Sequence, residues 1–188
     1  MRKLLLERNL VSPISLLILM SIAMPVAFNA WSAMLNNFVV EKAAFTGVEI
    51  GILQSLREVP GFLSFTLIFV LLVVKEQTFA VFSLALLGLG VCLTGFFPTV
   101  YGLYFTTVLM SIGFHYFEAV KQSLSLQWLS KSEAPIVLGK LLAVGSLTSL
   151  IVYGCLWTLL EFFKLPYWIN FAIAGGICMA IALIMFLL

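Results

Sequence analysis

Long apolar stretches, separated where charged residues, proline and glycine gather, dominate the chain. The bilayer core offers the backbone no water, so a crossing segment must satisfy its own hydrogen bonds as a helix, which takes about 20 residues. The pattern predicts six helices, near residues 13–36, 48–74, 78–96, 99–128, 135–160 and 166–188. We therefore expect an all-α integral membrane protein in which residues 1–188 form a single six-helix transmembrane domain.

The positions of proline support these breaks. Four of the six prolines stand where a predicted helix begins: Pro13, Pro98, Pro135 and Pro166. The first turn of a helix tolerates proline because the N–H of that position has no partner within the helix. Pro25 and Pro60 instead fall inside predicted helices, which we expect them to kink or loosen.

Composition points to lipid as the solvent. Hydrophobic residues make up 63% of the 188 positions and charged residues 10%, and the mean hydropathy is +1.17. A water-soluble fold needs more polar surface than this composition supplies. The net charge of +2 is spread along the chain without a Lys/Arg cluster, which excludes nucleic acid as an expected partner. The lipid bilayer is the expected surrounding, and we predict a multi-pass protein of the plasma (inner) membrane.

The distribution of Lys and Arg predicts the orientation, because these residues are enriched in cytoplasmic loops. The N-terminal segment and the loops on its side carry six of them: Arg2, Lys3, Arg8, Lys75, Lys131 and Lys140. The alternate loops carry only Lys42 and Lys164. We therefore place the N-terminus in the cytoplasm. The apolar run after Pro13 is too long for the core of a signal peptide, so we expect it to stay as the first helix.

Polar residues concentrate on the first, second and fourth predicted helices, at spacings of three or four that place them on one face. Ser21, Pro25, Asn29, Ser32 and Asn36 follow one another on the first helix, and Ser111, His115, Glu118, Gln122 and Ser125 on the fourth. The fifth helix is milder, with Gly145, Ser146 and Ser149, and the third and sixth are almost wholly apolar. Lipid penalises an exposed polar stripe, so these stripes should face a cavity or each other, while the third and sixth helices meet lipid.

Nine of these polar residues are our candidates for a substrate or coupling-ion cavity: Asn29, Ser32, Asn36, Gln54, Arg57, Glu58, His115, Glu118 and Gln122. Glu118 is the most informative, since His115 precedes it by one turn and Gln122 follows it by one turn. Its carboxylate either contacts the substrate or a coupling ion, or pairs with Lys121 three residues later.

Other candidates also have two interpretations. Arg57 and Glu58 are adjacent, so their side chains leave the helix about 100° apart, and we expect each to find its partner on another helix or in water. Arg57 suits either an anionic substrate or an outer gate or packing contact. Asn29 and Asn36 bind either a ligand or a neighbouring helix.

Small residues recur every four positions at Ala172, Gly176 and Ala180 on the sixth helix, which predicts a close helix–helix contact. This contact is either a self-association surface or packing against the third or fifth helix.

The order of helices, polar, polar, apolar, then polar, mildly polar, apolar, has the character of a three-plus-three repeat, and inverted repeats of this kind underlie many secondary transporters. The layout resembles the N-terminal six-helix half of the major facilitator superfamily (MFS). The stretch GVEIGILQSLREVPG, Gly47 to Gly61, resembles the start of that family's second helix, and the segment from Gly113 to Lys140 is similar in style.

The resemblance implies an MFS-like 3+3 inverted-repeat bundle. In it the first and fourth helices line the substrate cavity, the second and fifth flank it, and the third and sixth pack outside. The loop between the second and third helices, VVKEQTFA, lacks the Asp of that family's loop motif, so Lys75, Glu76 and Gln77 take no gating role from the resemblance.

We therefore expect a secondary transporter, or half-transporter, that moves an unidentified small-molecule solute by alternating access, with proton coupling as an option. The alternatives are a non-transporting membrane interaction protein or truncated transporter remnant, and a membrane component of an ATP-driven importer. A typical MFS member has two such halves, so the expected partner is a second copy in a homodimer or a second half-transporter chain. The chain has no Asp and no G-x-S-x-G turn, so we expect no enzyme activity, catalytic residue, metal or cofactor.

Overall fold

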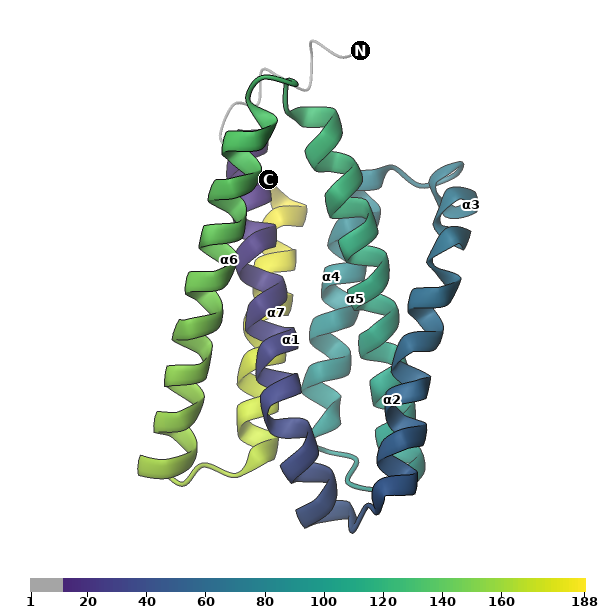
Figure 1. Cartoon of the computed structure of the whole chain (residues 1–188), viewed down its shortest axis with the longest axis vertical. Helices are drawn as coiled ribbons and strands as arrows, with labels where there is room; N and C mark the ends of the chain where they lie inside the picture. The colour runs from purple at the N-terminus through teal and green to yellow at the C-terminus, as the bar shows by residue number, and fades with distance from the viewer. Residues whose placement is uncertain (1–11) are drawn as a thin grey trace.

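The computed structural model describes residues 12–188, which are almost entirely helical and contain no strand. The helices are α1 (Pro13–Ala43), α2 (Gly47–Phe62), α3 (Leu67–Leu71), α4 (Glu76–Thr94), α5 (Val100–Trp128), α6 (Ala134–Trp157) and α7 (Tyr167–Leu187) (Figure 1). A 3₁₀ segment, Leu63–Thr66, joins α2 to α3, and a π-helical turn, Thr158–Phe162, extends α6. The predicted all-α fold is confirmed. Arg2, Lys3 and Arg8, used to predict the orientation, lie outside the described residues.

Four helical stretches within residues 12–188 are long and apolar enough to cross a membrane: Pro13–Ala43, Glu76–Thr94, Ala134–Phe162 and Tyr167–Leu187. They fit a membrane location. The other two predicted crossings correspond to α2–α3 and to α5. α2 ends after 16 residues, and α5 carries His115, Glu118 and Lys121 along its 29 residues.

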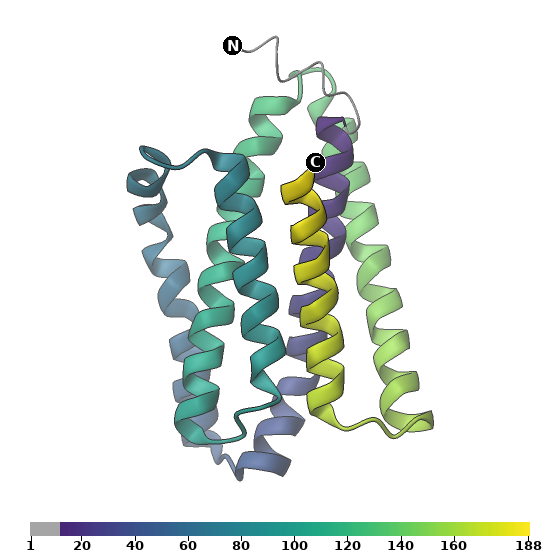
Figure 2. The same cartoon turned by 180° about the vertical axis from the view of Figure 1, so that it is seen from behind.

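The helices lie side by side and alternate in direction, as Figures 1 and 2 show from opposite sides. The start of α1, the α3–α4 and α5–α6 links and Leu188 lie at one end of the bundle, and the other three links lie at the opposite end. α4 packs against both α5 and α7, and α7 also packs against α1. α2 packs mainly against α5, and α6 mainly against α1.

Glycines explain why α4 lies so close to its neighbours. A Cβ on Gly113 of α5 would lie 2.2 Å from the backbone nitrogen of Leu87, and one on Gly90 of α4 would lie 2.4 Å from that of Met110. On the other side, a Cβ on Gly175 of α7 would lie 2.3 Å from the carbonyl oxygen of Gly88. Only glycine permits these backbone approaches.

The expectation that the third and sixth helices simply meet lipid is therefore incomplete. α4 and α7 each expose one face but bury the other. Within the most apolar 18 residues of each stretch, 50% of the residues are buried in α4. Only 11% are buried in the stretch that contains α6. α2 buries only Leu53 and Pro60. The helices with the least burial are thus α2 and α6, which flank the bundle.

The small-residue stripe predicted on the sixth helix, Ala172, Gly176 and Ala180, does not make the close contact. A Cβ added to Gly176 would meet no atom within 4 Å. The close contact is one residue earlier, at Gly175, which faces Gly88 and Cys92 of α4. Adjacent helical positions point about 100° apart, so a shift of one residue selects a different face.

The first helix continues to Ala43, beyond the predicted end near residue 36. Lys42, which we assign to a loop from the charge pattern, and Glu41 are both exposed on the last turn of the helix, where charge costs the helix little. The helix ends where Ala44 takes a left-handed conformation, φ 53°, and its N–H bonds to the carbonyl of Val39.

The two internal prolines behave differently. Pro60 lies near the end of α2, and within one turn the helix gives way to the 3₁₀ segment, as expected from its missing N–H. Pro25 is buried within α1, which continues through it without interruption.

Candidate functional site

A groove of about 470 Å³ lies between α1, α5 and α6. Its polar lining residues come from all three helices: Ser21, Asn29, Glu118, Lys121, Gln122, Ser125, Ser146 and Ser149. Their spacing along each helix is the three- and four-residue spacing that predicted polar stripes. Three of the nine predicted cavity residues, Asn29, Glu118 and Gln122, line this groove together.

Asn29 joins α1 to α6 at the groove. Its Nδ2 donates a hydrogen bond of 2.7 Å to Oγ of Ser149, and Ser149 in turn donates to the carbonyl of Gly145 at 2.8 Å. Of the two roles expected for Asn29, the structure shows the bond to a neighbouring helix.

Among residues 12–188, Glu118 and Lys121 are the only charged residues in the lining. Nζ of Lys121 lies 3.9 Å from Oε1 of Glu118, three residues earlier on α5. The two form an ion pair, but the distance is too long for a good hydrogen bond. The Lys121 side chain is 20% exposed and that of Glu118 43%. The predicted pairing of these residues is present, and both face the groove.

Apolar side chains make the rest of the lining, mainly Met24, Phe28, Phe114, Leu138, Leu141 and Leu142. The rings of Phe28 on α1 and Phe114 on α5 stack with centroids 4.1 Å apart and planes at 13°. Stacked aromatic rings present a rigid apolar wall. The groove therefore combines a few charged and polar groups with apolar surface, as sites for small molecules do.

The candidates on α2 lie away from this groove, against α5. Arg57 donates to Oε1 of Glu58 from Nε at 2.9 Å and from Nη2 at 2.6 Å. The prediction that these neighbours would not pair is wrong, because the Arg side chain is long enough to reach around the helix surface. Glu58 Oε2 also lies 3.8 Å from Nε2 of His115 on α5. Arg57, Glu58 and His115 thus form one cluster between α2 and α5.

Side chains of α5 also contact the region where α2 gives way to the 3₁₀ segment. The ring of His115 packs against Gly61, where an added Cβ would lie 2.7 Å from the ring. Oη of Tyr116 donates to the carbonyl of Leu63 at 3.2 Å and lies 2.5 Å from Oγ1 of Thr66, and Ser111 donates to the carbonyl of Arg57. Carbonyls near the end of the interrupted helix thus find partners on α5.

The remaining three candidates join neither the groove nor this cluster. Ser32 and Asn36 are exposed on the later turns of α1. Gln54 is half-buried on α2, and its Oε1 has no hydrogen-bond partner among residues 12–188. The structure therefore brings three of the nine candidates together in the groove and three others together between α2 and α5.

Sequence reasoning left out several residues that line the groove. Lys121 was considered only as a partner of Glu118, although it faces the same space. Ser21, Ser125, Ser146 and Ser149 belonged to the recognised stripes but not to the candidates. The stripe itself was the signal that could have included them.

The start of α4 has its own contact with α5. Gln127 donates to Oε2 of Glu76 at 2.6 Å, and Ser123 lies 3.4 Å from both oxygens of that carboxylate. Glu76 thus ties the start of α4 to the last turns of α5.

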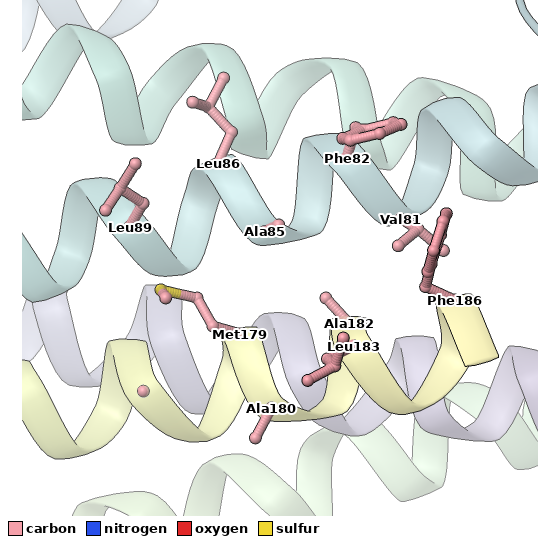
Figure 3. A pocket seen from close by; sticks show the side chains of 11 residues that line it. Val81, Phe82, Ala85, Leu86, Leu89, Met179, Ala180, Ala182, Leu183 and Phe186 are labelled. Atoms are coloured by element: carbon pink, nitrogen blue, oxygen red, sulfur yellow. The ribbon is translucent and has the colours of Figure 1, made fainter.

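A second, larger groove of about 670 Å³ runs between α4 and α7, with Phe82, Leu86, Met179 and Phe186 among its walls. Figure 3 shows only carbon and the sulfur of Met179 among the side chains drawn there. Such a surface suits hydrocarbon and has no side-chain group to orient a polar solute. The groove between α1, α5 and α6 is therefore the candidate site.

The fold and this groove define a class: an all-helical protein, compatible with a membrane location, with a polar groove among its helices. Among residues 12–188, no three His, Cys or Glu side chains gather closely enough to hold a metal ion. The chain matches no family model, no curated protein and no solved structure.

Proposed function

We propose that this protein is a secondary transporter, or half of one, that moves a small solute across the plasma membrane by alternating access. The groove between α1, α5 and α6 is its solute site. The observation that carries the proposal is the placement of Glu118 and Lys121 in a groove between α1, α5 and α6, helices made mainly of apolar residues. Ionisable groups among such helices are costly, and those that persist typically serve a solute or ion pathway.

The neighbour pattern of the helices supports an MFS-like arrangement. With α2 and α3 counted as one, α1 packs against α6 and α7, as α5 packs against α2 and α4, and α4 packs against α7. If α1 is exchanged with α5, α2–α3 with α6 and α4 with α7, the same main pairings result. An inverted 3+3 repeat has this property. The resemblance then implies a second six-helix half as partner, either another copy or a different chain.

Uptake into proteoliposomes, with and without a pH gradient, tests the proposal. Against a panel of amino acids, sugars, organic acids and organic cations, we expect uptake of at least one solute above that of protein-free liposomes. Glu118→Gln should reduce it, because it removes the negative charge of the groove.

Glu161→Gln is the matched control, since Glu161 pairs with Lys164 at 3.0 Å on the exposed end of the stretch that contains α6, outside the groove lining. This variant should keep full uptake. Absence of uptake for every solute, in both gradients, contradicts the proposal. Copurification with an ATPase would favour an importer component instead.

The proposed orientation places the groove on the cytoplasmic side. Most of its lining residues come from the first half of α1, the second half of α5 and the first half of α6, which lie toward the end that holds the α5–α6 link. In a variant lacking Cys92, Cys155 and Cys178, we expect Gln122→Cys to react with a membrane-impermeant maleimide in inside-out vesicles but not in intact cells.

Tyr101→Cys is the control on the same helix, because Tyr101 is 85% exposed on the first turn of α5, at the opposite end. It should react in intact cells. The reverse labelling pattern of the two variants would show that the orientation is wrong.

A further inference from the structure

Two polar atoms in the groove between α1, α5 and α6 are buried without a hydrogen-bond partner in the described part of the chain: Oγ of Ser21 and Oε1 of Glu118. Ser21 is only 1% exposed. Buried polar atoms almost always have hydrogen-bond partners, and one left without a partner destabilises the fold. Both atoms belong to residues that line the groove, so the polar groups around it are not fully paired with one another.

The charges of the groove limit the chemistry of that ligand. Glu118 and Lys121 together have no net charge, and the 3.9 Å between Oε1 and Nζ exceeds a good N–H···O bond. A solute with one charge would satisfy one of them and leave the groove with a net charge, which is costly in surroundings of low dielectric. A solute that carries both an ammonium and a carboxylate group satisfies both.

The apolar wall limits the rest of the solute. Phe28 and Phe114 stack on one another in the lining, and Leu138, Leu141 and Leu142 of α6 join them. A volume of about 470 Å³ falls in the range of small-molecule sites, roughly 300–1,000 Å³. An apolar side chain of moderate size fits such a wall.

We propose that the groove binds a zwitterionic solute of the α-amino acid type with an apolar side chain. Its ammonium group contacts Glu118, its carboxylate contacts Lys121, and its side chain lies against the apolar wall. The inference rests on the proposed function in naming this groove as the solute site, but it concerns binding and is tested without transport.

The test is equilibrium binding of tritiated L-leucine to the purified protein in detergent, with unlabelled competitors. We expect L-leucine, L-valine and L-phenylalanine to compete. Isopentylamine, which lacks the carboxylate, and 4-methylpentanoate, which lacks the ammonium, should compete at least about tenfold less well, a difference of about 1.4 kcal/mol. Equal competition by either of these compounds, or no binding of any zwitterion to the folded protein, overturns the inference.

Substitution of the two charged residues tests whether binding occurs in this groove. Glu118→Gln and Lys121→Met should each weaken L-leucine binding at least about tenfold. The matched controls are Glu161→Gln and Lys164→Met, which change an exposed pair at the same spacing and should leave binding unchanged. If the single variants unfold, the double variant Glu118→Gln/Lys121→Met serves, since it keeps the groove without net charge. Undiminished binding by the folded double variant overturns the inference.

The outcomes separate this inference from the proposed function. Zwitterion binding without uptake of any solute contradicts transport and leaves the binding site standing. Uptake of another solute without zwitterion binding contradicts the inference and leaves transport standing.

Discussion

Gly175→Ala is expected to destabilise the bundle, whereas Gly176→Ala, one residue later, leaves its stability nearly unchanged. A Cβ at Gly175 would lie 2.3 Å from the carbonyl oxygen of Gly88 and 2.6 Å from the backbone nitrogen of Cys92. These are backbone atoms of α4, so no side-chain rotation relieves the clash and the helices must separate. Overpacking of this kind typically costs about 1–3 kcal/mol, and backbone contacts place it at the upper end.

The measurement is thermal unfolding of the purified variants, followed by tryptophan fluorescence. Gly176 is the control, because a Cβ there meets no atom within 4 Å and alanine favours a helix over glycine. Equal unfolding temperatures for the two variants would contradict the packing of α7 against α4 described above.

Gly145→Phe is expected to abolish both uptake and zwitterion binding. Gly145 lines the groove, and a Cβ there would lie 3.5 Å from the carbonyl oxygen of Ser21, an ordinary contact. Gly145→Ala should therefore fold and keep activity, while a phenyl ring at this position occupies the space proposed for the solute. Uptake should fall to that of protein-free liposomes, as measured with the solute that the panel identifies.

Gly154→Phe on the same helix is the matched control, since a Cβ there meets no atom within 4 Å and the residue does not line the groove. It should keep uptake and binding. Full uptake by folded Gly145→Phe would exclude this groove as the solute site.

The helical fold was predictable because each apolar run in lipid has one way to satisfy its backbone. Which helices would pack against one another was harder to predict. Gly175 and Gly176 are equally small, and periodicity alone does not say which of two adjacent faces meets another helix. The choice depends on the backbone of α4, where Gly88 lies directly opposite Gly175, whereas no atom lies within 4 Å of a Cβ at Gly176.

Part of the candidate site was also predictable from helical spacing. Spacing placed Asn29, Glu118 and Gln122 on the right faces, because a helix maps sequence onto angle directly. It did not show that Arg57 and Glu58 belong to a separate cluster with His115, since that depends on which helices flank α5. It also gave the wrong result for the Arg57–Glu58 pair, because side-chain length is not part of the periodicity.

The contacts that hold the two flanking helices determine which interactions resist a change in the width of the groove. α6 is tied to α1 by the bond between Asn29 and Ser149, and α2 is tied to α5 by the bonds that Tyr116 makes with Leu63 and Thr66. Behind them, the close approach at Gly175 joins α4 to α7. A change in groove width therefore requires neither flanking pair to separate. The resistance to it comes instead from contacts that cross from one pair to the other, and the stacked rings of Phe28 and Phe114 are the aromatic contact in that position.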